Sequence, residues 1–232
     1  MDRGTTLIIA VTGIIVIFVL AFLKKNRKMH MFTTKFITRT ALFAAISIVL
    51  YLVPYFNIAL PFFPSFLKVH IDEVPAFIAG FAYGPLSAIF ILLVKTIAKL
   101  PLSFSGGTHG VGELADLIYS LAFILPASII YRKNRSLKGA VLGMSISFFI
   151  QLAVASFLTT FVMIKFYIFV MGWNEHMILS MCQAVNPAIK SLDWPFFFIV
   201  ALPFNAFKNV VVIGLTLLLY KRLHAFIDKQ VA

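Results

Sequence analysis

The feature that most constrains this chain is a series of apolar runs of about 20 residues, most of which end near clustered lysines and arginines. Hydrophobic residues make up 61% of the 232 residues and charged residues only 12%, whereas soluble domains carry about 25% charged residues. Too few charged side chains remain to cover a water-facing globule, and 26 phenylalanines exclude a disordered chain. Cys182 is the only cysteine, which excludes an intrachain disulfide scaffold. The composition therefore predicts an all-α, polytopic membrane protein.

The net charge of +12 has a distribution that points to a membrane topology and not to a nucleic-acid partner. Basic residues concentrate in the segments 24–39, 132–138 and 221–229, each of which follows or precedes an apolar run. Short loops rich in lysine and arginine stay in the cytoplasm. We therefore expect all three segments on the inner face of the membrane, with the N-terminus outside.

Seven apolar runs are long enough, or nearly so, to be helices of a membrane domain. The first run is followed by two lysines and lacks a small-residue cleavage site, so we favour an uncleaved helix over a secretory signal peptide. It would form an N-terminal unit with its basic linker over residues 1–34, ahead of a six-helix membrane domain over residues 35–232. The segment 168–193 is read as a hydrophobic outer connection. The expected helices span residues 5–23, 36–56, 71–83, 86–102, 113–131, 139–167 and 194–220.

Ionisable residues at membrane depth are functional candidates because their burial is costly. We expect Lys95 to pair with a carboxylate such as Asp116, and Lys99 to extend toward the outer face. Glu113 begins an expected helix, where an acidic side chain either complements the helix dipole or shapes the rim of a pocket. The residues leave these two roles for Glu113 equally open.

The segment around Lys208 combines three unusual features within an apolar run. Asn205 and Lys208 are three residues apart and share a helix face, while Pro203 removes a backbone donor and opens the helix locally. An interhelical hydrogen-bonding cluster would explain the pair. We favour a binding site, because one ammonium and one amide suit an uncharged or weakly acidic polar ligand.

The sequence contains no motif for catalysis, metal binding or ATP hydrolysis. Neither His70 nor His109 has a second ligand at a spacing typical of metal sites, and the glycine-rich segment 106–112 matches no nucleotide-binding pattern. That segment is better read as a flexible lid. We expect no catalytic residue, no metal and no cofactor, and any ATP-driven role requires partner subunits.

Several motifs, taken in order, resemble the substrate-binding S components of energy-coupling factor vitamin transporters, with the riboflavin-specific branch most similar. The resemblance covers residues 36–223. The motifs are Phe62-Phe-Pro-Ser-Phe-Leu-Lys68, Asp72-Glu-Val-Pro75, Gly84-Pro85, Lys95, the glycine-rich segment that continues through Gly110-Val-Gly-Glu-Leu-Ala115, and Pro203-x-Asn-x-x-Lys208.

The resemblance implies a fold, a location and partners. It implies a six-helix core in the plasma membrane of a bacterium, with the first run as an extra helix outside that core. It also implies capture of riboflavin from outside and uptake with a membrane coupling subunit and two ABC-type ATPase subunits, and no enzyme activity. Ala41 and Ala45 match the small-residue motif that the family uses to meet its coupling subunit, although packing within the chain is the default explanation of such a pair.

The resemblance also implies site residues. Asn205 and Lys208 match positions that hydrogen-bond riboflavin, and the loop segment 62–67, with Phe62, Phe63, Phe66 and Leu67, contributes apolar contact. These phenylalanines can stack on a planar ring or anchor the chain at the membrane interface.

One position departs from the family pattern. Riboflavin-type members usually carry an asparagine in the fifth core helix, where this chain has Thr159 beside Thr160. The hydroxyl in place of an amide keeps other ligands open: the flavin nucleotide FMN, folate, pantothenate or another vitamin. A membrane enzyme or scaffold is the alternative from a different class.

Overall fold

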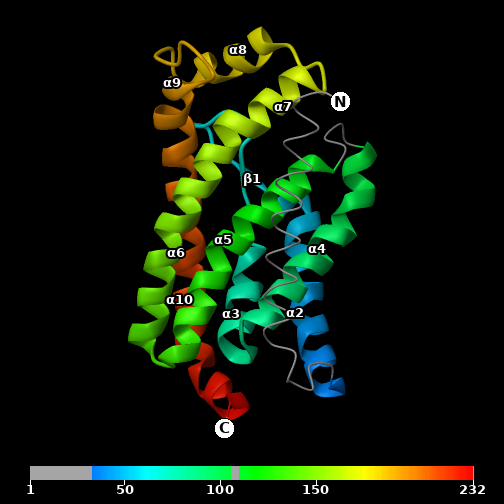
Figure 1. Ribbon diagram of the computed structural model, residues 1–232, viewed down its shortest axis with the longest axis vertical. Coiled ribbons are helices and arrows are strands. Elements are labelled where there is room, and N and C mark those ends of the chain that lie inside the picture. The colour runs from blue at the N-terminus through cyan, green and yellow to red at the C-terminus, as the bar shows by residue number, and fades with distance from the viewer. Residues whose placement is uncertain (1–32, 106–109, 232) are drawn as a thin grey trace.

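The computed structural model describes residues 33–105 and 110–231, with the side chains of 33–101 and 110–222. The expected helix at 5–23, the N-terminal unit 1–34 except for its last two residues, and most of the glycine-rich segment with His109 lie outside the described residues. The rest is almost entirely helical (Figure 1). Within the described residues, helices of membrane-spanning length and hydropathy occupy Thr34–Leu52, Val111–Lys133, Leu137–Phe169 and Trp194–Arg222.

The helices follow the apolar runs, and polar residues mark where several of them begin. The Thr33 hydroxyl accepts a hydrogen bond from the Phe36 amide at the start of α2, and Ser136 does the same for Gly139 at the start of α6. Gly84, with φ of 93°, forms the tight turn between α3 and α4. The long helices are α2 (Thr34–Leu52), α4 (Pro85–Ser105), α5 (Val111–Lys133), α6 (Leu137–Leu158) and α10 (Leu202–Val231), and the shorter ones are α3 (Glu73–Tyr83), α7 (Ile164–Phe169), α8 (Glu175–Val185) and α9 (Trp194–Phe196).

Helix α3 is the centre of the bundle. All of its residues except Tyr83 are buried, and α2, α4, α5 and α10 pack around it. Gly80 lies directly against Ser128 of α5, so a larger residue there would force the Ser128 side chain to move. Phe77, Phe81 and Phe123 are buried in this core, and the Phe77 and Phe123 rings of α3 and α5 pack edge to face. The short run predicted at 71–83 is therefore a fully enclosed helix and not one that faces lipid.

The basic segments gather at one end of the molecule. Helix α2 begins, the connection between α5 and α6 turns, and α10 ends at the lower end in Figure 1, while α8 lies at the opposite end. Lys35, Arg132 and Lys221 mark these three places. The arrangement agrees with the predicted topology, with the lower end facing the cytoplasm.

Two helices contain a wider turn at the same level. Residues Thr159–Met163 and Phe197–Ala201 form single π-helical turns that contact each other, the first between α6 and α7 and the second between α9 and α10. The second turn lies just before Pro203, where a missing backbone donor was expected to open the helix. Such turns often occur at functional sites.

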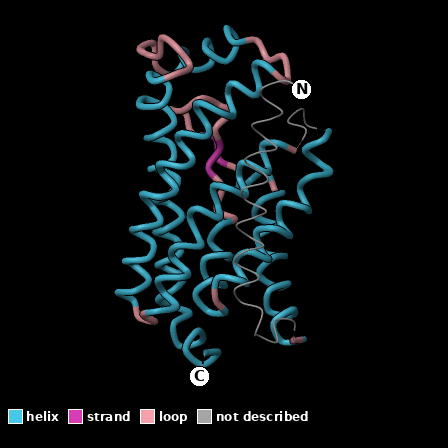
Figure 2. The backbone as a smooth tube through the Cα atoms, in the orientation of Figure 1, coloured by secondary structure: helices cyan, strands magenta, loops and turns pink. Residues whose placement is uncertain are grey.

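The outer connection 168–193 differs from the prediction, because part of it is a helix. Helix α8 begins after Asn174, whose side chain accepts a hydrogen bond from the His176 amide, and it buries Ile178 and Cys182. The aromatic loop after α2 also contains a small element: β1 (Ile58–Ala59) pairs antiparallel with β2 (Lys68–Val69), visible as the magenta segment in Figure 2. This pairing holds the loop against the bundle on the side of α8.

Candidate substrate-binding site

A cavity of about 840 Å³ lies in the outer half of the molecule, between the aromatic loop, the helices α5, α7, α8 and α10, and the π-helical turn Thr159–Met163. Its volume falls within the range of about 300–1,000 Å³ that is typical of small-molecule sites. The lining residues that carry the argument below are Tyr51, Phe66, Leu67, Lys68, His70, Lys99, Glu113, Asp116, Tyr119, Thr159, Tyr167, Trp173, Met177, Ile178, Met181, Phe204, Asn205 and Lys208.

One side of the cavity is apolar and aromatic. Phe66 and Leu67 approach from the loop, and Met177, Ile178 and Met181 approach from α8. Three methionine or isoleucine side chains from one helix give a deformable surface that suits a flat ring. Charged residues of the lining come from other helices: Lys99 from α4, Glu113 and Asp116 from α5, and Lys208 from α10.

Lys208 lies at the floor of the cavity and is held by an acidic partner. Its Nζ donates a hydrogen bond to Oε1 of Glu73 at 3.1 Å, and the Ser120 hydroxyl donates to the same oxygen at 2.9 Å. The second carboxylate near the ammonium belongs to Asp116, at 3.9 Å. The binding-site and interhelical-cluster interpretations of Lys208 are therefore compatible: the ammonium lines the cavity, and its charge is balanced by Glu73 from α3.

Asn205 uses its amide nitrogen within the protein. Nδ2 donates to the Ala201 carbonyl at 2.8 Å and to the Ser156 hydroxyl at 3.3 Å. The Ala201 carbonyl ends the π-helical turn, so the side chain completes the backbone bonding there. The amide oxygen is the group of Asn205 that remains to accept a hydrogen bond from a ligand.

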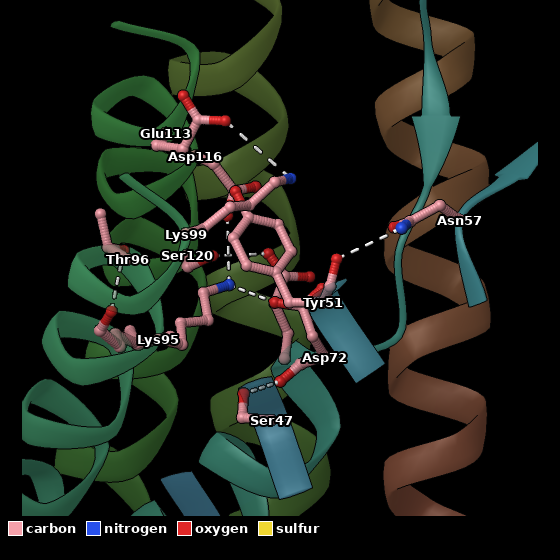
Figure 3. A network of polar contacts seen from close by, with 12 residues as sticks. Ser47, Tyr51, Asn57, Asp72, Lys95, Thr96, Lys99, Glu113, Asp116 and Ser120 are labelled. Carbon is pink, nitrogen blue, oxygen red and sulfur yellow. Dashed lines mark hydrogen bonds and ion pairs between the residues drawn. The ribbon is translucent and has the colours of Figure 1, made fainter. Parts of the chain in front are cut away.

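A second ion cluster lies beside the first and fixes α3, α4 and α5 together (Figure 3). Lys95 pairs with Asp72 and, at 3.1 Å, with Oδ2 of Asp116. The predicted pairing of Lys95 with Asp116 is confirmed, and Asp72 is a partner that the prediction missed. Because Lys95 is fully buried and does not line the cavity, its role is to hold Asp116 in place.

Lys99 reaches Glu113 in the first turn of α5, at the end of that helix opposite to the basic residues Arg132 and Lys133. Its Nζ lies 3.6 Å from the centre of the Tyr51 ring and 4.0 Å from Oε1 of Glu113 (Figure 3). Both the aromatic face of Tyr51 and the carboxylate of Glu113 attract the ammonium. Glu113 is buried in the first turn of α5 and lines the cavity. It is therefore placed both to complement the helix dipole and to shape the pocket, the two roles that the sequence left open.

The two neighbouring threonines point in different directions. The Thr159 hydroxyl donates to the Tyr119 hydroxyl at 3.1 Å, and both residues line the cavity. Thr160 is fully buried, does not line the cavity, and its hydroxyl has no hydrogen-bond partner in the described part of the chain. Consecutive helical residues face different sides, which is why only one of the pair reaches the cavity.

The loop phenylalanines divide in the same way. Phe66 and Leu67 line the cavity, whereas Phe62 and Phe63 do not. Phe62 is 62% exposed, which matches the interfacial interpretation. Phe63 packs edge-on against Phe204 of α10, with ring centres 5.4 Å apart, so it supports the cavity wall from behind.

Several lining residues were missed by sequence reasoning. Tyr51 and Tyr119 lie in apolar runs where one tyrosine carries no signal, and Met177 and Met181 lie in the segment taken for a loop. His70 was considered only as a metal ligand, and among the residues that the structure describes no cluster suits a metal ion. The available signal for a lining role of His70 was its place in the sequence, two residues after the aromatic loop motif that ends at Lys68.

Together, these features define a class of protein: a polytopic α-helical membrane protein whose outer half encloses a cavity of small-molecule size, with an apolar wall and a charged floor. Within that class, a family described as "ECF transporter, substrate-specific component" matches residues 35–220. The chain belongs to this family, the S components of energy-coupling factor transporters, and is a membrane protein.

Characterised relatives and a solved structure support the assignment. The chain is 30% identical over 206 residues to "Riboflavin transporter RibU" of Staphylococcus aureus, covering 88% of this chain and 98% of the relative. It is 26% identical to "Riboflavin transporter FmnP" of Bacillus subtilis, over 75% of this chain and 85% of the relative. A structure described as the S component of a bacterial ECF transporter superimposes with a TM-score of 0.62 and 28% identity, over 83% of this chain and 96% of that one.

Proposed function

We propose that this S component binds riboflavin in the cavity beneath α8 and takes it into the cell together with a membrane coupling subunit and two ABC-type ATPase subunits. The observation that carries the proposal is the division of the cavity into an apolar wall and a polar floor. Riboflavin has the same division, with a planar, largely apolar isoalloxazine ring and a polyhydroxyl ribityl chain. The names of the two relatives point to the same ligand.

The proposed contacts follow from the lining. Phe66 and Leu67 pack on the ring, and the Asn205 oxygen, the Lys208 ammonium and the Thr159 hydroxyl supply hydrogen bonds. Glu113 accepts from the ligand at the outer rim. Three other residues suggested by the sequence do not line the cavity, and we do not propose that they touch the ligand. Thr160 is buried inside the bundle, and Phe62 and Phe63 belong to the aromatic loop.

A different small vitamin, or FMN, remains the second candidate because Thr159 stands where riboflavin-type members carry asparagine. The charges of the cavity favour uncharged riboflavin over FMN. A phosphate would compete with Glu113 for Lys99 and with Glu73 and Asp116 for Lys208, so the protein anions oppose it. We expect FMN to bind at least about tenfold more weakly, a difference of about 1.4 kcal/mol.

The surface of α2 supports docking to the coupling subunit. Ala41 and Ala45 are exposed among the described residues, which supports a contact made outside this part of the chain. Leu42 and Ile46 flank them and are also exposed. Small residues in an apolar face allow a partner helix to approach closely, and we propose this face as the contact with the coupling subunit.

The test is a titration of the purified protein, freed of endogenous ligand, with riboflavin, FMN, folate and pantothenate. We expect quenching of flavin fluorescence with riboflavin at submicromolar concentration and no competition by folate or pantothenate. The Asn205→Ala variant should bind about 5- to 150-fold more weakly, because 1–3 kcal/mol is the range for an unmet buried polar group. A folded wild-type protein that shows no quenching at micromolar riboflavin contradicts the proposal.

A further inference from the structure

His70 lines the cavity, and its ring nitrogens have no hydrogen-bond partner among the described residues. It follows β2 directly, in the connection to α3, and its ring leans on Tyr51 with centres 5.8 Å apart. Nδ1 is completely buried, whereas Nε2 is not enclosed by protein, and the ring lines the cavity. The open nitrogen is therefore Nε2, and it faces the space that a ligand would occupy.

The neighbouring charged groups are already engaged with one another and do not satisfy this nitrogen. Lys95 pairs with Asp72 and Asp116, and Lys208 pairs with Glu73. His70 lies outside the candidate membrane spans, and burial lowers the pKa of its ring to about 4. The imidazole is thus neutral at physiological pH, with one nitrogen as a donor and the other as an acceptor. A polar atom without a partner in such a place costs free energy until a ligand supplies one.

The chemistry around His70 indicates which ligand group fits. On the same side of the cavity, Glu113 and Asp116 only accept hydrogen bonds, and Lys99 only donates them. A carbonyl group could accept from Lys99, and from Nε2 only in the tautomer that carries the proton there, but it could not donate to the carboxylates. A carboxylate or phosphate would be repelled by the acidic residues. A hydroxyl both donates and accepts, so a chain of hydroxyls can satisfy this mixed set and can bond to Nε2 in either tautomer.

We propose that His70 is a specificity-determining residue that hydrogen-bonds, through Nε2, to a hydroxyl of the ligand's polyol chain. The inference rests on the proposed binding of riboflavin and assigns its ribityl chain to the side of the cavity formed by His70, Lys99, Glu113 and Asp116. The ring then lies against the apolar wall of Phe66, Leu67 and α8.

Replacements of His70 can separate a hydrogen bond from simple packing on Tyr51. His70→Phe keeps an aromatic ring of similar shape and removes both nitrogens. His70→Gln places an amide near the position of Nε2 and loses the ring, while His70→Asn reaches only the position of the buried Nδ1. A packing role predicts that Phe is tolerated and Gln is not, and the hydrogen-bond role predicts the reverse.

The experiment compares riboflavin with lumiflavin, which has the same ring system with a methyl group in place of the ribityl chain. Each of the four proteins is titrated by flavin fluorescence, after folding is checked by circular dichroism and size-exclusion chromatography. We expect His70→Phe and His70→Asn to bind riboflavin about 5- to 50-fold more weakly. His70→Gln should stay within about threefold of wild type, and the affinity of each variant for lumiflavin should match that of the wild-type protein.

Three results would overturn the inference while leaving the proposed function in place. They are unchanged riboflavin affinity in His70→Phe, a loss in His70→Gln as large as in His70→Phe, and equal losses for riboflavin and lumiflavin. If His70→Phe does not fold, His70→Asn against His70→Gln decides the same question. A folded wild-type protein that binds neither flavin contradicts the proposed function itself.

Discussion

Lys208 of α10 and Glu73 of α3 are 135 residues apart in sequence. At the floor of the cavity, each side chain neutralises the charge of the other. Both side chains are almost completely buried. Removing one charge leaves the other without compensation in a medium where charges are poorly solvated, whereas removing both leaves only a smaller polar gap. The pair therefore combines a structural role with the proposed binding role, and a cycle of mutations can separate the two.

We expect Lys208→Met to lower the stability of the folded protein by about 3–5 kcal/mol, the usual range for breaking a buried ion pair on one side. The double variant Lys208→Met with Glu73→Gln should recover most of that loss. Thermal unfolding in detergent measures both. Riboflavin affinity of the double variant should stay well below that of wild type, because the ligand still lacks the ammonium. Full recovery of affinity together with stability would show that Lys208 has no binding role.

The pH dependence of stability offers a second test at the level of one side chain. Burial holds the pKa of His70 at about 4 against an ordinary value of 6.5, with Asp72 and Asp116 favouring the charged ring and Lys208 and Lys95 opposing it. The unfolded chain therefore takes up the proton first as the pH falls. The contribution of the neutral His70 ring to the stability of the folded protein is therefore present above pH 6.5 and is lost progressively as the pH falls from about 6.5 to 4.

We expect wild-type protein to lose stability relative to His70→Gln over that interval, by up to about 1.4 kcal/mol per pH unit for one proton. Denaturant titrations of both proteins at several pH values measure the difference, since the other titrating groups are common to the two. Parallel curves for the two proteins between pH 6.5 and 4 would contradict the buried, neutral state of the ring.

Among the elements, the boundaries of the long helices were predictable, and the fine structure of the site was not. The run predicted at 113–131 is α5 at Val111–Lys133, because polar residues and a glycine bound it on both sides. The π-helical turn at Thr159–Met163 contacts the turn at Phe197–Ala201, and no local sequence pattern encodes a contact between such distant segments. The contacts of Lys99 with Tyr51 and Glu113 were not predicted for the same reason, since both partners come from other helices.

Helix α8 was missed because its segment is hydrophobic, like the runs on either side, and too short to span a membrane. Ile178 and Cys182 form its buried face, which packs against the rest of the protein, while Met177 and Met181 line the cavity. The helix therefore covers the proposed ligand, and its contacts change if it lifts. Cys182 is a natural reporter of that motion because it is the single cysteine of the sequence.

Burial raises the pKa of the Cys182 thiol to about 11, and the reactive thiolate is scarce at neutral pH. We expect maleimide to label Cys182 slowly at pH 7.4, and at least about tenfold more slowly than the same protein unfolded in denaturant. Saturating riboflavin should slow labelling further by holding α8 closed. Mass spectrometry of timed samples, with Cys182→Ser as the blank, follows the reaction. Labelling that riboflavin leaves unchanged would indicate that α8 does not move with the ligand.

At the scale of the whole molecule, binding and uptake belong to different surfaces. The cavity lies in the outer half, beneath α8, whereas Ala41 and Ala45 are exposed residues of α2. Neither alanine lines the cavity, and α2 contributes only Tyr51 to its wall. A change on the face of α2 can therefore affect assembly with the coupling subunit without altering the ligand's surroundings.

We expect the double variant Ala41→Leu with Ala45→Leu to retain riboflavin affinity within about twofold, because no ligand contact changes, and to lose at least about 90% of riboflavin uptake in cells. Two leucines keep the face apolar and add bulk where a partner helix must approach closely. The matched control is Leu42→Ala with Ile46→Ala, which keeps the same helix apolar without adding bulk and should retain more uptake. Uptake measured with labelled riboflavin, and co-purification of the coupling subunit, report on the two steps. Normal uptake in the double leucine variant would place the subunit contact on another face.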